Sequence, residues 1–173
     1  MYKVLIIEEN KMLSDSLITL INWEEHGFQI LGVVSNGIVG RAIMERQKPD
    51  IILLSMSTTY LGGKGFIEAV ENISYRFSII QLYSEPSSLV NSKNYSVKIS
   101  ISLNRMGLNP QDLIRALATA SADITGGNED NLNFMVHQPF SVQRNDVILK
   151  TLKGITKEEY INVSKQYRLK FHD

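Results

Sequence analysis

Short aliphatic runs alternate with amphipathic segments along the first 122 residues of the chain. The aliphatic runs have the length of buried parallel strands, and they fall at residues 4–7, 28–34, 50–55, 77–83 and 97–103. Between them, apolar side chains recur every three or four residues, as on one face of a helix, at residues 11–22, 37–47, 64–73 and from Asn109-Pro110 onward. This alternation predicts an α/β fold with a five-stranded parallel sheet covered by helices on both faces.

One connection lacks the apolar positions that a helix needs. Residues 84–96 read SEPSSLVNSKNYS and offer only Leu89, Val90 and Tyr95 as apolar anchors. Serine, asparagine and proline favour turns over helices because their side chains or rings compete with helical backbone bonding. We therefore expect at most a short turn of helix between the fourth and fifth strands, and the least ordered part of the domain.

The composition shifts after Ala122. Residues 123–133, DITGGNEDNLN, are rich in Gly, Asn and Asp and are typical of a linker. Two capped apolar stripes follow, so the chain divides into a domain at 1–122, a linker at 123–139 and a helical extension at 140–173. Two short helices cannot bury both of their apolar stripes against each other. We expect this extension to contribute to a homodimer.

Composition narrows the functional classes. Eighteen basic and eighteen acidic residues give no net charge, which argues against a broad nucleic-acid surface on this chain. Without cysteine there is no disulfide or thiolate chemistry. The N-terminal MYKVLIIEEN is a strand with no signal-peptide pattern, and no apolar run approaches the ~20 residues that span a membrane. These features predict a cytosolic protein without a membrane partner.

The third strand ends in Ser55, at the sheet edge where open α/β folds place their sites. The glycines that follow, in Gly62-Gly63-Lys64-Gly65, lack the spacing of a phosphate-binding loop. A serine hydroxyl needs a general base before it can act as a nucleophile. His26, His137 and His172 fall in a turn, in the linker and at the C-terminus, away from the strand ends.

Three stretches resemble the receiver domain of bacterial two-component response regulators. They are YKVLIIEEN, LINWEEHGFQILGVVSNG and KPDIILL, and the resemblance covers residues 1 to about 122. The middle stretch is similar to receivers joined to an AraC-type DNA-binding domain, and so is the tail ILKTLKGITKEEYINVSKQYRLKF. The resemblance implies a flavodoxin-like (βα)5 receiver domain with a C-terminal helical extension.

The resemblance also implies where an acidic pocket and a phosphoacceptor would lie. The acidic pair that binds Mg²⁺ in the family corresponds to Glu8 and Glu9, which replace aspartates. The aspartate that accepts the phosphoryl group corresponds to Ser55. Because Mg²⁺ requires near-octahedral oxygen ligands, the loss of one carboxylate and the lengthening of two others disfavour a bound metal cofactor. We expect no cofactor.

Two further family positions are altered. The hydroxyl residue that senses the phosphoryl group corresponds to Tyr83, with Ser84 beside it. The lysine that pairs with the phosphoryl oxygens corresponds to Arg105 in an ungapped alignment, or to Met106 when Asn109-Pro110 is the anchor. One of the two acidic side chains is placed to pair with Arg105.

These departures predict a degenerate receiver domain that works without phosphorylation, as the regulatory and dimerisation module of a transcriptional regulator. DNA would be contacted only through a domain that this chain does not contain, and a histidine kinase is a candidate partner. The alternative is a free-standing adaptor that binds a histidine kinase or another regulator. An enzyme is not expected, because no set of nucleophile, base and orienting group can be assembled from the strand-end residues.

Overall fold

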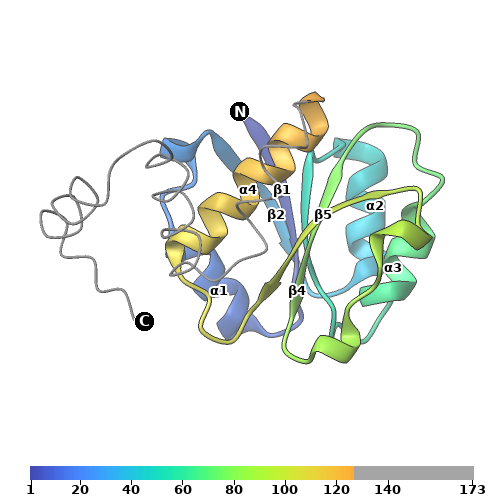
Figure 1. The fold of residues 1–173 in the computed structure, drawn as a ribbon, viewed down its shortest axis with the longest axis horizontal. Helices are drawn as coiled ribbons and strands as arrows, with labels where there is room; N and C mark the ends of the chain where they lie inside the picture. Colours follow the sequence, from blue (N-terminus) through green and yellow to red (C-terminus); the bar gives the residue numbers. More distant parts are fainter. Residues whose placement is uncertain (127–173) are drawn as a thin grey trace, which may run out of the picture. The chain divides into compact units, whose positions relative to one another are not determined.

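The computed structural model describes residues 1–126, which form one parallel sheet with the strand order β2-β1-β3-β4-β5. The strands are β1 (Tyr2–Ile7), β2 (Phe28–Val34), β3 (Ile51–Ser55), β4 (Ser78–Tyr83) and β5 (Lys98–Asn104). The helices are α1 (Lys11–Leu20), α2 (Gly37–Gln47), α3 (Gly63–Val70) and α4 (Pro110–Thr125). Helices α1 and α4 cover one face of the sheet, and α2 and α3 cover the other (Figure 1). The predicted sheet and helix layers are confirmed.

The two central strands explain the continuous apolar runs in the sequence. Val4–Ile7 in β1 and Ile51–Leu54 in β3 have no exposed side-chain surface, because helices cover the sheet from both sides. Full burial of one such side chain contributes about 1.5–3 kcal/mol relative to leaving it in water. The order β2-β1-β3 reverses the direction of sheet growth between β1 and β3, and folds of this kind place their sites outside that point.

Asparagine caps start three of the four helices on the side where the strands end. Each cap accepts a hydrogen bond from the backbone N–H of the third residue of its helix, which satisfies one of the four donors that a helix start leaves unpaired. The caps are Asn10 for α1, Asn36 for α2 and Asn109 for α4. These caps fix where each chain segment turns, and so they fix the loops around the carboxyl edge of the sheet.

The connection from β4 to β5 contains no α-helix, as the sequence predicted. It carries two three-residue 3-10 turns, Pro86–Ser88 and Ser92–Asn94. Gln81, a buried residue of β4, holds the segment by bonding both backbone groups of Val90, accepting from its N–H at 3.1 Å and donating to its carbonyl at 3.2 Å. The Gln81 amide thus ties the middle of this segment to the sheet, and Val90 and Tyr95 also pack against the apolar core.

Some predicted boundaries need correction. Helix α3 ends at Val70, before residue 73, and α4 continues to Thr125 before the left-handed cap Gly126. Residues 123–125 are therefore the last turn of α4, and the predicted start of the linker at residue 123 is wrong. The rest of the linker and the helical extension at 140–173 lie outside the described residues.

Candidate functional site

Polar side chains from four strand ends meet at the carboxyl edge of the sheet. Glu8 follows β1, Ser55 closes β3, Ser84 follows β4 and Arg105 follows β5. Ser55 is fully buried and Glu8 is 4% exposed, so both lie inside the cleft and not on its rim. The parallel topology brings together residues that are far apart in the sequence, as the sequence analysis expected for Glu8, Ser55 and Ser84.

Arg105 crosses this cleft and contacts the other three residues. Its Nη1 lies 3.3 Å from Oε2 of Glu8 and 3.3 Å from Oγ of Ser55, and its Nε donates to Oγ of Ser84. The Glu8 side chain is 2% exposed and that of Arg105 is 20% exposed. A carboxylate this deeply buried requires a counter-charge, and the guanidinium supplies it. The expected pairing of an acidic residue with Arg105 is found.

The two glutamates that the sequence grouped as a pair serve different contacts. Oε1 of Glu8 also accepts the backbone N–H of Asn10 at 2.8 Å, which holds it in the cleft. Glu9 is exposed and accepts the backbone N–H of Thr59 at 2.9 Å and its hydroxyl at 3.0 Å. Glu9 therefore fastens the β3–α3 connection, a role that nothing in the sequence pattern indicated.

The exposure and contacts of the side chains show which of Arg105 and Met106, and which of Tyr83 and Ser84, lies in the cleft. Met106 is 71% exposed, whereas Arg105 lies in the cleft, at the position that the ungapped alignment assigns to the family's lysine. Tyr83 is half-buried and packs against the apolar cluster that includes Leu54 and Ile79. Ser84, its neighbour, is the residue that contacts Arg105. The sequence named both residues but not this contact.

The contacts of the Ser55 hydroxyl offer little support for a reaction at this residue. The Ser55 hydroxyl has two partners, Ser57 Oγ at 3.3 Å and the Arg105 guanidinium. His26 lies in the turn before β2, at the opposite edge of the sheet from these strand ends. Within residues 1–126, no three His, Asp or Glu side chains gather where they could hold one metal ion.

The glycines after β3 have a structural explanation. Gly62 caps α3, and a Cβ atom there would lie 2.1 Å from the carbonyl oxygen of Thr58. Gly63 has a φ of 51°, in the left-handed region that favours glycine. Tight packing and backbone conformation thus account for both residues without a phosphate ligand.

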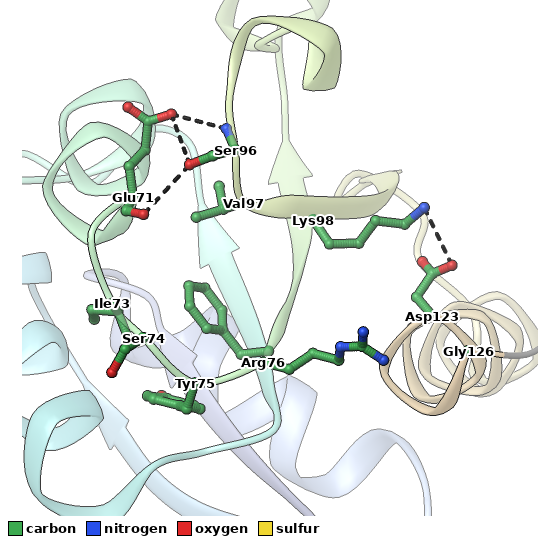
Figure 2. Close-up of a pocket in the computed structure, with 11 residues that line it drawn as sticks. Glu71, Ile73, Ser74, Tyr75, Arg76, Ser96, Val97, Lys98, Asp123 and Gly126 are labelled. Atoms are coloured by element: carbon green, nitrogen blue, oxygen red, sulfur yellow. Dashed lines mark hydrogen bonds and ion pairs between the residues drawn. The ribbon is translucent and has the colours of Figure 1, made fainter.

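A separate hollow lies at the amino edge of the sheet, away from the cleft (Figure 2). It has a volume of about 510 Å³ and is lined by the α3–β4 connection, the start of β5 and the end of α4. Its charged side chains already have partners: Glu71 with the N–H of Ser96 (3.0 Å), Lys98 with Asp123 (3.5 Å) and Arg76 with the carbonyl of Ile124 (3.0 Å). Within residues 1–126, the charged side chains of this hollow are therefore paired with one another or with the backbone.

Sequence similarity to a known protein covers part of the chain. No family model matches the chain. It is 29% identical over 87 residues to the virulence-factor transcription regulator BvgA of Bordetella pertussis, a match that covers 50% of this chain and 41% of that protein. The chain thus spans less than half the length of this curated relative.

Solved structures resemble the fold. The response regulatory domain of MrkE from Klebsiella pneumoniae superposes with a TM-score of 0.61 at 17% identity, covering 72% of this chain and 98% of that one. The receiver domain of the sensor histidine kinase PA1611 from Pseudomonas aeruginosa, solved with magnesium in its active-site cleft, gives a TM-score of 0.56 at 19% identity, covering 73% and 98%. Residues 1–126 therefore have the fold of a response-regulator receiver domain. No helix among them is long and apolar enough to cross a membrane.

Proposed function

We propose that this chain is a receiver-like regulatory domain of a transcription regulator, and that its state is not set by phosphoryl transfer to Ser55. The observation that carries the proposal is the position of Arg105. Its guanidinium contacts the serine at the expected acceptor position and the buried Glu8 at the expected acidic pocket. A positively charged side chain of the protein itself thus lies between the two groups that phosphoryl chemistry would use.

Ser55 is a poor phosphoryl acceptor in this setting. A hydroxyl near its ordinary pKa attacks only when a base removes its proton. The nearest buried carboxylate, Glu8, already accepts from Arg105 and from the backbone of Asn10. Among residues 1–126, the Ser55 hydroxyl therefore contacts a guanidinium and another hydroxyl, but no carboxylate or imidazole that could accept its proton.

Magnesium binding is disfavoured by the same arrangement. Mg²⁺ in proteins is held by one or two carboxylates together with phosphate and water oxygens. In this cleft Glu9 is engaged with Thr59 and Glu8 with Arg105, so a cation would have to displace the guanidinium or lie against it. We propose that the domain works without a bound metal and is not an enzyme.

The names of the relatives support a role in transcription regulation. BvgA is named a transcription regulator, and this chain covers 41% of its length. We propose that DNA contact requires a domain beyond the residues of this chain, of the AraC type that the sequence resembles.

The same proposal includes a homodimer, formed with help from residues 140–173, and a histidine kinase as partner. Light scattering that compares residues 1–173 with residues 1–126 tests the dimer; equal association of the two chains would exclude a role for the extension.

Thermal unfolding with and without millimolar Mg²⁺ tests the proposed state of the cleft. A ligand that binds only the folded state raises stability by ~2.7 kcal/mol at a hundred times its Kd. We expect no rise in Tm for the wild type and a rise for Arg105→Gln, in which Glu8 is free to bind a cation. A rise in the wild type that is lost in Glu8→Gln or Glu9→Gln would overturn the proposal.

A further inference from the structure

A small apolar pocket opens beside the Glu8–Arg105 pair, between α1 and the β5–α4 connection. Its volume is about 80 Å³. Leucine side chains make up most of its wall: Leu13, Leu17 and Leu20 on one face of α1, Leu82 from β4 and Leu108 after β5. One end of this apolar wall meets the charged groups of the cleft. The pocket is therefore amphipathic.

Arg105 supplies unused hydrogen-bond donors at the polar end. A guanidinium carries five N–H donors. Nε donates to Ser84, and Nη1 lies near Glu8 and Ser55. Among residues 1–126, Nη2 has no partner, although the side chain is only 20% exposed. Charged donors in such surroundings favour an anionic acceptor, and a planar carboxylate matches the guanidinium best.

We propose that this pocket binds a short-chain aliphatic monocarboxylate, with its carboxylate on Arg105 and its alkyl chain among the leucines. The volume sets the chain length. A water molecule takes ~30 Å³ in the liquid, so a pocket of about 80 Å³ has room for about three carbon atoms, the length of the alkyl chain of butyrate. Glu8 already shares the charge of Arg105, and binding is accordingly weak, with a dissociation constant in the millimolar range. The site does not depend on whether Ser55 accepts a phosphoryl group.

The occupied pocket would be connected to the rest of the domain through Arg105. This side chain touches Ser55 at the end of β3 and Ser84 at the start of the β4–β5 connection. A ligand that draws the guanidinium toward α1 changes both contacts. Small-molecule binding would thus act on the same residues that phosphorylation addresses in related folds.

The test is a titration of ¹⁵N-labelled protein with butyrate, followed by amide chemical shifts. We expect saturable shifts at Leu17, Arg105 and Leu108. Acetate, which has the head without the tail, and 1-butanol, which has the tail without the charge, are expected to bind at least about tenfold more weakly. The absence of saturable shifts with butyrate, or equal binding of butyrate and 1-butanol, would overturn the proposal.

Two variants of α1 separate the pocket from the helix surface. Ser16 lines the pocket and is exposed, so Ser16→Phe fills the space without disturbing the core. Thr19→Phe adds the same ring to an exposed position that does not line the pocket. Butyrate shifts should vanish in Ser16→Phe and persist in Thr19→Phe, and Arg105→Gln should lose the preference for butyrate over 1-butanol. Retained binding in Ser16→Phe contradicts the site. None of these outcomes bears on phosphorylation of Ser55.

Discussion

Nη1 of Arg105 lies 3.3 Å from the hydroxyl oxygen of Ser55, although 50 residues separate them in the chain. The same nitrogen lies 3.3 Å from Oε2 of Glu8, 97 residues away. Strands β1, β3 and β5 deliver these three residues to one edge of the sheet. A single side chain therefore neutralises the buried carboxylate and occupies the space beside the serine.

Removing Arg105 should destabilise the domain. In Arg105→Ala the Glu8 carboxylate stays buried without its counter-charge, which costs about 3–5 kcal/mol. Urea unfolding measures the difference. Arg41→Ala is the matched control, because Arg41 pairs with Glu45 at 3.3 Å on an exposed helix face, where such pairs are worth about 0.3–0.5 kcal/mol. Equal losses in both variants would show that Glu8 does not depend on Arg105.

The double variant Glu8→Gln/Arg105→Ala refines this prediction. A neutral amide at position 8 needs no counter-charge, so the second substitution should cost less than Arg105→Ala does alone. The coupling free energy between Glu8 and Arg105 is then clearly different from zero. Strict additivity of the two single substitutions would contradict the pairing.

Gln81→Leu should release the β4–β5 connection. The substitution removes both hydrogen bonds to the backbone of Val90 and costs about 1–3 kcal/mol if these groups stay partly buried. Hydrogen exchange should accelerate at the Val90 amide more than at the amides of β3. Gln29→Leu, at an exposed position of β2, should leave exchange in residues 84–96 unchanged. Unaltered exchange in Gln81→Leu would mean that apolar packing alone holds the segment.

Two glycine-to-alanine substitutions should change the free energy of unfolding in opposite directions. In Gly37→Ala the new Cβ would lie 1.6 Å from the carbonyl oxygen of Leu61, so the start of α2 must shift, at a cost of at least ~1–3 kcal/mol. In Gly65→Ala, inside α3, the nearest atom is 3.7 Å away, and alanine should stabilise the helix by about 0.5–1 kcal/mol. Chemical denaturation measures the stability of both variants. It thereby tests how tightly the β3–α3 connection packs against α2.

Tyr75 predicts a pH dependence at high pH. Its hydroxyl is buried without a hydrogen-bond partner in the described residues, and burial, assisted by the nearby charge of Asp50, raises its pKa above the ordinary value. The unfolded chain ionises near pH ~10 and the folded chain does not, so stability falls as the pH rises above ~10. Tyr75→Phe should remove this contribution, and it should stabilise the protein at pH 7 because no buried hydroxyl is left unpaired. Tyr60→Phe, at an exposed position, should change neither property.

The sequence predicts the sheet well because its strands are nearly pure aliphatic runs. Ile51–Leu54 can be buried only between two helix layers, and Asn109-Pro110 marks a helix start that the structure confirms. The weak β4–β5 connection is equally evident from its composition. The end of α4 was harder to place, because residues 123–125 have linker-like composition but continue the helix to Gly126.

The candidate site is only partly predictable. The strand-end position identifies Ser55, and the resemblance to receiver domains adds Glu8 and Arg105; parallel strands align their carboxyl ends at one edge, which brings the three residues together. Side-chain direction is not encoded in any local pattern, so the contacts of Ser84 with Arg105 and of Glu9 with Thr59 were not foreseen. Gln81 illustrates the same limit: a polar residue inside an apolar strand suggests a buried hydrogen bond, but its partner depends on how the next connection folds.

Intact-mass spectrometry after incubation with acetyl phosphate and Mg²⁺ tests the central claim most directly. A receiver domain that carries the aspartate serves as the positive control in the same buffer. We predict no phosphate adduct on this chain, because no base contacts the Ser55 hydroxyl among residues 1–126 and this hydroxyl faces the Arg105 guanidinium. A stoichiometric adduct that maps to Ser55, and that disappears in Ser55→Ala, would contradict it.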